Sequence, residues 1–336
     1  MLRHPSLQGT RKDIEPSNVA RERARSIGTV SAARRSSGKA TGPSAKELGI
    51  SHPERVVYPG AGITKLDVAQ YYYAMADLIL RYSKNRPLAL VRCPTGLAGA
   101  CFFQKHATDA VGNGLARVPI KESDGTGIYL AATDRQGLVA LAQMGVLELH
   151  IWDSRADALE RPDMFVMDLD PDEALPFSDV VESAGLIRAL LQELGLASFV
   201  KTTGGKGLHV VVPLQRRSSW DDVKRFTQGL ADHMARTMPA HFTAKMAKPR
   251  RKGKIFVDYL RTARGATAVA PYSLRARPGA PIATPLHWDE LIRGLDPREF
   301  NLKTASRLRT RTDPWPGYFD LAQSITRDMR RRLGVD

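Results

Sequence analysis

Apolar positions along the chain recur with two periods, one typical of helices and one typical of strands. Between Lys65 and about Tyr82 they recur at helical spacing, and Thr64 precedes them as an N-cap. The same reasoning predicts helices over 134–144, 178–194 and 219–238. Strands are predicted over 87–92, 101–105, 128–130, 146–152, 164–170, 199–203, 208–213 and 255–260. Hairpins and crossovers both occur, so we expect a mixed-sheet α/β (α+β) domain rather than a doubly wound parallel sheet.

Chain length and composition set the domain organisation. The chain has 336 residues, 43% of them hydrophobic, which suffices for one large domain. Residues 1–46 are rich in Arg, Ser, Ala and Gly without an apolar period, so we expect a disordered basic tail. The main domain is expected over 47–315, with a basic helix in 316–336 that packs on the domain or trails it. No apolar run approaches the roughly 20 residues of a membrane span, so no membrane partner is expected.

The net charge of +15 indicates a polyanionic partner. The tail holds ten Lys or Arg and three Asp or Glu, so the folded part is basic in its own right. A charge that serves only solubility is the alternative. Cys93 and Cys101 form neither a metal-type motif nor a disulfide scaffold, so a reducing cytoplasm is the default expectation.

The most informative segment is an apolar strand that carries two acids. Asp168 and Asp170 lie two residues apart, so they share one face of the strand, while Met167 and Leu169 take the other. Adjacent carboxylates repel unless a cation lies between them, and Mg²⁺ and Mn²⁺ favour oxygen ligands. An Asp-x-Asp in a surface turn is the alternative. The sequence therefore makes the two acids candidate ligands of a divalent metal.

A third acid, Asp258, lies on another apolar strand. Three aspartates on two strands could hold one or two divalent ions, and two ions can stabilise the attacking and leaving oxygens of a phosphoryl displacement. An ion pair of Asp258 with Arg261 or Arg264 is the alternative.

A glycine-rich hairpin, Gly204 to Gly207, separates two predicted strands. Glycines let the backbone approach a phosphate, Lys206 adds a charge, Thr203 a hydroxyl and His209 a donor. The P-loop spacing is missing, and a G-G-K-G string alone is often an ordinary turn. The presence of the acids favours the interpretation of the hairpin as a phosphate-binding element.

Other residues suit an enzyme that handles nucleic acid. Phe102 and Phe103 could stack on a base, or belong to the core or to an interface. Arg275 and Arg277 share a face and could clamp a triphosphate. Basic side chains that suit a DNA backbone, or a solvated surface, are Lys105, Lys248, Arg250, Arg251, Lys252 and Lys254.

Taken together, these motifs resemble one family. The chain is similar to the polymerase domain of bacterial end-joining DNA ligase D, a branch of the archaeo-eukaryotic primase superfamily. The matching segments lie in order at 62–67, 86–94, 102–106, 143–150, 167–171, 204–209, 255–261 and 272–278. The family usually has serine where this chain has Thr203, which keeps the hydroxyl.

The resemblance implies a primase-polymerase that adds ribo- or deoxyribonucleotides at 3′ ends, at gaps and double-strand breaks, during non-homologous end joining. It implies two Mn²⁺ or Mg²⁺ ions on Asp168, Asp170 and Asp258, with His150 in the catalytic pocket. Nucleoside triphosphate contacts are implied for Thr203, Lys206, His209, Arg275 and Arg277. DNA contacts are implied for Arg55 and Lys65 at a 5′-phosphate, Phe102 and Phe103 at the template, and the 245–254 loop where two ends meet.

The implied partners are double-stranded DNA ends with a 5′-phosphate, a Ku-type end-binding protein and an ATP-dependent ligase. The K-x-D-G motif of such a ligase is missing, so we expect a stand-alone polymerase, or a product of domain splitting, that works with a ligase in trans. The expected location is the cytoplasm, at the bacterial nucleoid. Two other functions stay open. One is a non-catalytic scaffold that binds 5′-phosphorylated ends, and the other is a two-metal nuclease.

Overall fold

The computed structural model describes residues 42–108, 112–292 and 294–335. Most of the predicted basic tail, residues 1–41, lies outside these described residues. The first helix, α1 (Ala45–Leu48), begins within the range assigned to the tail, because Ser44 and Glu47 form a capping box.

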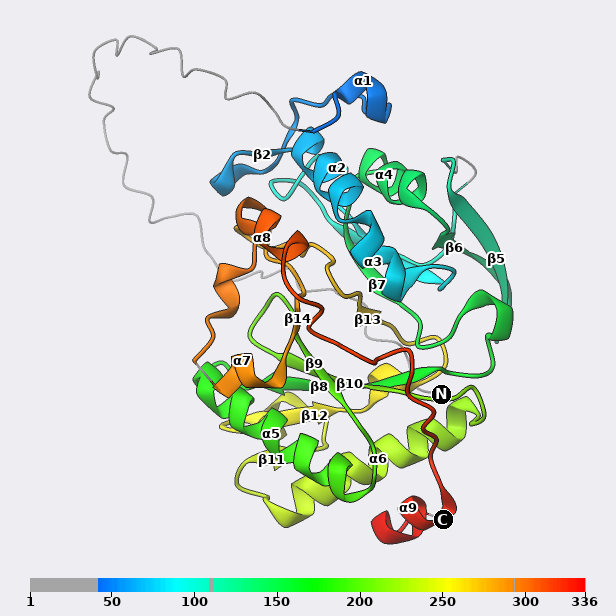
Figure 1. Ribbon diagram of the computed structural model, residues 1–336, viewed down its shortest axis with the longest axis vertical. Coiled ribbons are helices and arrows are strands. Elements are labelled where there is room, and N and C mark those ends of the chain that lie inside the picture. Colours follow the sequence, from blue (N-terminus) through cyan, green and yellow to red (C-terminus); the bar gives the residue numbers. More distant parts are fainter. Residues whose placement is uncertain (1–41, 109–111, 293, 336) are drawn as a thin grey trace, which may run out of the picture. The chain divides into compact units, whose positions relative to one another are not determined.

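The first of two six-stranded sheets has the strand order β13-β7-β3-β6-β5, with β4 paired to β3. Its neighbouring strands are antiparallel. The strands are β3 (Leu88–Arg92), β4 (Phe102–Gln104), β5 (Leu115–Glu122), β6 (Gly125–Ala132), β7 (Val146–Ile151) and β13 (Ala268–Val269). The helices that share a core with this sheet are α2 (Lys65–Ala74), α3 (Ala76–Ser83) and α4 (Arg135–Gln143). Figure 1 shows these three helices together beside β7.

The second sheet has the order β11-β12-β8-β10-β9-β14, antiparallel except for β11 and β12. Its strands are β8 (Met164–Pro171), β9 (Phe199–Thr202), β10 (Leu208–Pro213), β11 (Phe242–Thr243), β12 (Ile255–Asp258) and β14 (Pro285–Leu286). Two long helices, α5 (Phe177–Glu193) and α6 (Trp220–Thr237), pack against it (Figure 1). Met167 and Leu169 of β8 face these helices, whereas Val166 belongs to the core of the first sheet. Asp168 and Asp170 therefore point to the side of β8 that is turned away from α5 and α6, as the alternation predicted.

Short elements complete the fold. They are β1 (Val56–Tyr58), β2 (Ile63–Thr64), α7 (Trp288–Ile292), α8 (Ser306–Arg309) and α9 (Arg327–Leu333). The 3-10 helices are Pro59–Ala61, Ala156–Ala158, Lys248–Arg251, Leu260–Thr262, Pro297–Glu299 and Leu302–Thr304. The basic helix predicted at the C-terminus is α9, which packs on the second core through Leu333. Among the helices described here, none is both long and apolar enough to cross a bilayer.

Most predicted elements are present, and three of the differences have a clear local cause. The helix predicted over 65–82 is two helices, because the backbone of Met75 leaves the helical region at φ −95° and ψ 4°. Strand β5 was not predicted, since Pro119 interrupts its pattern. The structure accommodates that proline because β5 is an edge strand. Helix α5 begins at Phe177 after Pro176 and has no side-chain cap, whereas Ser178 was expected to open it.

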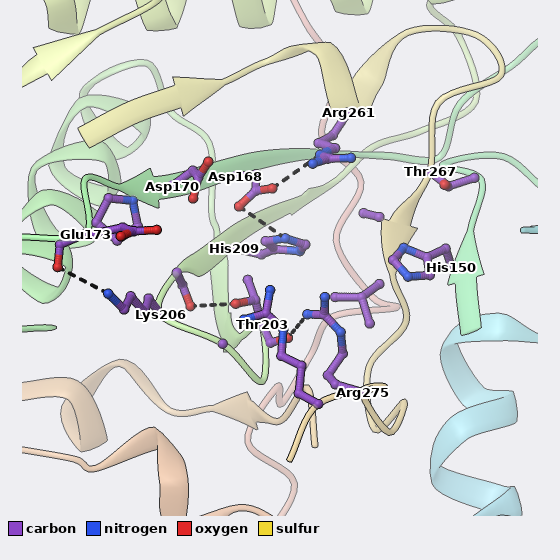
Figure 2. Close-up of a pocket in the computed structure, with 16 residues that line it drawn as sticks. His150, Asp168, Asp170, Glu173, Thr203, Lys206, His209, Arg261, Thr267 and Arg275 are labelled. Carbon is purple, nitrogen blue, oxygen red and sulfur yellow. Dashed lines mark hydrogen bonds and ion pairs between the residues drawn. The ribbon is translucent and has the colours of Figure 1, made fainter. Parts of the chain in front are cut away.

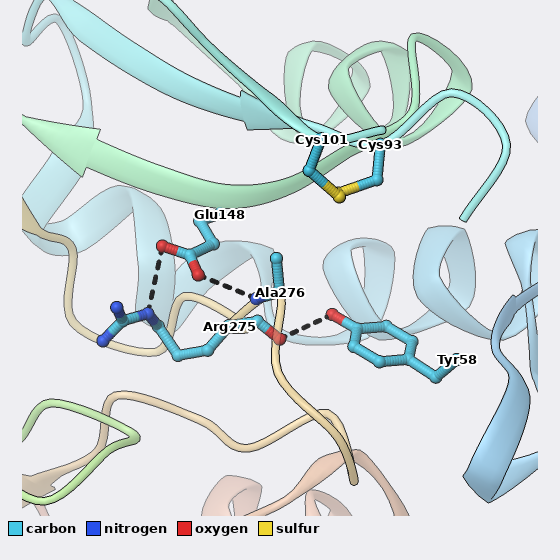
Figure 3. Close-up of a disulfide and its surroundings, with 6 residues drawn as sticks. All are labelled: Tyr58, Cys93, Cys101, Glu148, Arg275 and Ala276. Atoms are coloured by element: carbon cyan, nitrogen blue, oxygen red, sulfur yellow. Dashed lines mark hydrogen bonds and ion pairs between the residues drawn. A yellow bond between two sulfur atoms is a disulfide. The ribbon is translucent and has the colours of Figure 1, made fainter. Parts of the chain in front are cut away.

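Cys93 and Cys101 are joined by a disulfide (Figure 3), a pairing that the sequence did not indicate. The pairing follows from the strand register. Arg92 lies opposite Phe102 in the β3–β4 pair, and the two cysteines are the next residues outward. A separation of eight residues in the sequence did not reveal this register.

Candidate active site

A row of four polar side chains crosses the second sheet. The Cα partners are Asp258 and Asp168 between β12 and β8, Asp168 and His209 between β8 and β10, and His209 and Lys201 between β10 and β9. Directly opposed residues in adjacent strands put their side chains on the same face of a sheet. The row therefore places the two acids, the histidine and the lysine side by side.

A histidine and an arginine hold Asp168 in place. Its Oδ1 lies 3.4 Å from His209 Nε2, and its Oδ2 lies 3.2 Å from Arg261 Nε. Burial raises the pKa of the Asp168 carboxyl, but His209 and Arg261 outweigh burial and hold that pKa below its usual range. Asp168 is thus ionised at neutral pH.

The other two acids have different surroundings. Asp258 Oδ2 lies 3.2 Å from the same Arg261 Nε, and Asp258 Oδ1 accepts a hydrogen bond from the Leu260 amide. Asp170 Oδ2 accepts from Arg251 Nη1 at 2.9 Å. Burial, with the nearby charge of Asp168, raises the pKa of Asp170, and burial raises that of Asp258. An additional cation near these two groups would therefore relieve an electrostatic cost.

The arrangement of the acids differs from the one expected. Within the described residues, no three carboxylate, imidazole or thiol groups lie together as a set that could hold a metal ion. Instead, Arg261 bridges Asp168 and Asp258, as the alternative for Asp258 anticipated, and Arg251 neutralises Asp170. The donor set nonetheless fits a divalent ion, because carboxylate oxygens are the ligands that Mg²⁺ and Mn²⁺ favour and a guanidinium already bridges two of them. The metal assignment stays a prediction.

The glycine hairpin between β9 and β10 borders the same site. Thr203 Oγ1 donates to the Gly207 carbonyl, which closes the turn, and Lys206 Nζ donates to the Glu173 carbonyl at 3.2 Å. Gly204 has φ +67°, and a Cβ there would lie 2.6 Å from Arg275 Cγ. Glycine is therefore required at this position both by the backbone and by the close approach of Arg275.

Acids and hairpin line one cavity of about 400 Å³ (Figure 2). Side chains of both sheets reach it, since His150 comes from β7 and His209 from β10. The predicted residues that line it are His150, Asp168, Asp170, Thr203, Lys206, His209, Arg275 and Arg277. Asp258 does not line the cavity, but it forms an ion pair with Arg261, which does. The structure thus brings together nearly all of the predicted catalytic and nucleotide-binding residues.

Three further residues of the site were missed by sequence reasoning. Arg261 lines the cavity, Glu148 binds His150 and Arg275 behind it, and Lys201 ends the polar row. Lys201 is 1% exposed, and its Nζ has no hydrogen-bond partner among the described residues. Burial, with Arg275, lowers the pKa of Lys201 to about 7. Glu148 could have been found from the sequence, because it is an acid two residues from His150 in an apolar strand.

His209 lines the cavity from within the row and is itself buried, with 3% of its surface exposed. Its Nε2 faces Asp168, and its Nδ1 has no hydrogen-bond partner among the described residues. Burial and the nearby Lys201 lower the pKa of His209 to about 4, so the imidazole is neutral at pH 7. A neutral imidazole has one N–H group, so its hydrogen lies either on the unpartnered Nδ1 or on the Nε2 that faces Asp168.

The candidate DNA contacts lie outside the cavity. Phe102 and Phe103 are 46% and 48% exposed, so they are not core residues, and stacking on a base or packing at an interface remain as predictions. Lys65 is buried and donates to the Ser51 carbonyl and to Gln143, while Arg55 donates to the Pro94 carbonyl. These last two cations are therefore held in place by protein oxygens.

The basic loop is divided between two surroundings. Arg250 and Lys252 are exposed, and Lys105 is partly exposed. Arg251 instead turns inward, because it pairs with Asp170 and lies over the Phe256 ring at 3.9 Å. Arg251 was expected to contact DNA, and in this structure it contacts the acidic site.

The fold and the site define a mixed α/β domain of the primase-polymerase class. The family described as "LigD, primase-polymerase domain" matches residues 64–315, and this chain belongs to that family.

Individual relatives agree with this assignment. The chain is 41% identical to the multifunctional non-homologous end joining protein LigD of Pseudomonas aeruginosa, over 99% of this chain and 40% of that protein. The bifunctional LigD of Bacillus subtilis is 29% identical over 77% of this chain and 42% of that protein. The polymerase domain of Mycobacterium tuberculosis ligase D, solved in complex with DNA, superposes with a TM-score of 0.75 at 30% identity. That match covers 82% of this chain and 98% of the solved one, so the mixed α/β fold is the fold of this family.

Proposed function

We propose that the protein is a nucleotidyltransferase that adds ribo- or deoxyribonucleotides to DNA 3′ ends, at gaps and double-strand breaks, during non-homologous end joining. The observation that carries this proposal is one cavity that joins aspartates, a glycine hairpin and paired arginines. Membership of the LigD primase-polymerase family supports it. The chain spans 40% of its Pseudomonas relative, so the activity and partners of such longer proteins are part of the proposal.

The acids and the cations have separate roles in this proposal. Asp168, Asp170 and Asp258 would hold Mn²⁺ or Mg²⁺ after Arg261 and Arg251 move aside, and Arg261 has the exposure to do so, at 45%. Two such ions, when bound, lower the barrier to attack by the primer 3′-hydroxyl and to departure of pyrophosphate. Lys206, Arg275 and Arg277 bind the triphosphate oxygens, which orients the α-phosphorus for in-line attack.

DNA binding is proposed to use the surface beside the cavity. The exposed Phe102 and Phe103 stack on template bases, and Arg55 with Lys65 binds the 5′-phosphate of the downstream strand. Arg250 and Lys252 contact the backbone of a DNA end. A Ku-type protein and an ATP-dependent ligase are the proposed partners in repair.

The test is primer extension on a 5′-phosphorylated gapped duplex with Mn²⁺ and either ribo- or deoxyribonucleoside triphosphates. We expect a longer primer, and no extension when Asp168 and Asp170 are both changed to Ala. Bound DNA without extension under any metal would favour an end-binding scaffold. Shortening of the labelled end without nucleotides would favour a nuclease.

A further inference from the structure

Behind the cavity lies Glu148, a carboxylate that the predicted chemistry did not use. It lies on β7, two residues before His150, and is 5% exposed. A buried carboxylate is costly unless it is fully paired. Its partners therefore indicate why an acid is present in this apolar strand.

Glu148 contacts three groups from two separate parts of the chain. Its Oε1 accepts a hydrogen bond from the Ala276 amide at 2.8 Å. Its Oε2 lies 2.7 Å from His150 Nε2 and 3.0 Å from Arg275 Nε, the latter an ion pair without hydrogen-bond alignment. Figure 3 shows the carboxylate between Arg275 and Ala276. One side chain thus connects β7 with the segment that carries the cavity arginine.

The contact with His150 sets the position of the proton on its ring. Burial raises the pKa of Glu148, but His150 and Arg275 outweigh burial and lower the pKa to about 2. Glu148 is therefore ionised at neutral pH. Burial lowers the pKa of His150, so this ring is neutral. An ionised carboxylate only accepts, so Nε2 must carry the hydrogen and Nδ1 is left as an acceptor.

Arg275 is held at three points. Its Nε faces Glu148, its Nη1 donates to the Thr203 carbonyl of the glycine hairpin, and its own carbonyl accepts from Tyr58 Oη at 2.9 Å. A long, flexible side chain fixed in this way loses little freedom when a ligand arrives. The guanidinium is therefore oriented along the hairpin before a nucleotide binds.

We propose that Glu148 is a positioning residue for the incoming nucleotide, presenting His150 Nδ1 as an acceptor and Arg275 as a donor to the same ligand. His150 Nδ1 would accept a hydroxyl or amino hydrogen of the nucleotide, and Arg275 would bind its phosphate oxygens. This inference rests on the proposed nucleotidyltransferase function. Its physical basis is preorganisation of two contacts by a single buried charge.

The first test uses the unaltered protein and needs no activity. The ¹⁵N chemical shifts of the histidine rings, with His150 assigned from a His150→Gln sample, report which nitrogen carries the hydrogen. We expect His150 to be neutral with the hydrogen on Nε2 at pH 7.5. A hydrogen on Nδ1 alone, or a doubly protonated ring, would overturn the proposal.

The second test is Glu148→Gln. The amide can still accept from the Ala276 N–H, but its NH₂ group faces His150 Nε2 and leaves Arg275 without its counter-charge. We expect the hydrogen of His150 to move to Nδ1 and the KM for ATP with Mn²⁺ to rise about tenfold, the size of one charge-assisted contact. Both kcat and DNA affinity measured without nucleotide should change much less.

Glu122→Gln is the matched control. Glu122 also pairs with a histidine, His106, at 3.0 Å and with Tyr129 at 2.6 Å, but it does not line the cavity. It should leave the KM unchanged. A folded Glu148→Gln protein with the wild-type KM and His150 tautomer would refute the role of Glu148. A wild-type protein that neither binds nor incorporates ATP would instead refute the proposed function, and the tautomer measurement would still be informative.

Discussion

Single side chains in this site differ in what they offer to a substrate. Asp168 is ionised and sits between His209 and Arg261, whereas burial and Asp168 favour the neutral form of Asp170. Glu148 does not line the cavity, yet it contacts His150 and Arg275, which do. The charge of each acid at this site is thus set by its burial and its partners, and not by how many acids are present.

Replacing Asp168 by Asn should abolish most nucleotide addition while preserving the fold. The amide keeps the shape but loses the charge that a divalent ion needs, so we expect at least about a 100-fold loss of extension rate. Gel-based extension with Mn²⁺ measures the rate, and a binding assay should show unchanged DNA affinity. Asp172→Asn, in the turn after β8, is the control. Extension at the wild-type rate by a folded Asp168→Asn protein would rule out the metal assignment.

Glu148 should also affect the acid stability of the protein. Its folded pKa is about 2, below the ordinary value of 4.5, so its contribution is present above pH 4.5 and is lost as the pH falls toward 2. The thermal midpoint of the wild type should therefore fall more steeply between pH 5.5 and 3 than that of Glu148→Gln. Thermal unfolding followed by circular dichroism measures both slopes, and parallel slopes would contradict the assigned ionisation.

Elements position these residues through strand register and tight turns. The β12-β8-β10-β9 order aligns the polar row, and the hairpin between β9 and β10 brings Arg275 against Gly204. On the first sheet, β3 and the disulfide hold β4, which carries the exposed Phe102 and Phe103. The polar row and the two exposed phenylalanines thus depend for their positions on short segments with little conformational freedom.

The hairpin can be tested with Gly204→Ala. A side chain at φ +67° costs about 1 to 2 kcal/mol of stability, and its Cβ would also displace Arg275. Gly195→Ala is a matched control, because Gly195 has φ +81° with nothing within 4 Å. Both variants should lose similar thermal stability, but only Gly204→Ala should weaken nucleotide binding by calorimetry. Equal nucleotide affinity in the two would argue against the hairpin as a binding element.

Removing the disulfide should destabilise the fold. In the loop-entropy account, opening a bridge over a loop of this size costs about 2 to 3 kcal/mol. Thermal unfolding with and without a dithiol reductant should show a lower midpoint after reduction. A Cys93→Ser, Cys101→Ser double variant should unfold at the lower temperature and ignore the reductant. A wild-type midpoint that the reductant leaves unchanged would show that the bridge does not contribute.

At the scale of the whole molecule, a cavity lined by both acidic and basic side chains lies in a chain with a net charge of +15. Arginines inside the site neutralise its acids, while Arg250 and Lys252 remain exposed near the second sheet. Like charges at the surface attract a polyanion over distances of about 10 Å at 0.1 M salt. This charge distribution suits the polyanionic partner of the proposed function.

The double change Arg250→Ala, Lys252→Ala should weaken DNA binding at low salt most. Each lost phosphate contact should reduce the slope of log affinity against log salt by about 0.9. Fluorescence anisotropy across a salt series measures this slope. Arg298→Ala, an exposed arginine paired with Asp296, is the control and should not change it. An unaltered slope in the double variant would remove this loop from the DNA surface.

Periodicity alone determined much of this protein. It placed most helices and strands, put Asp168 and Asp170 on one strand face, and singled out the glycine hairpin, because these features depend on residues near in sequence. The resemblance to the family added His150, which also lines the cavity.

Tertiary structure decided the partners of those residues. Arg261 between Asp168 and Asp258, Glu148 bound to a segment 128 residues away, and the bridge between Cys93 and Cys101 all follow from strand register and packing. Long-range register is set by how two sheets bury their faces together, and no local pattern carries that information.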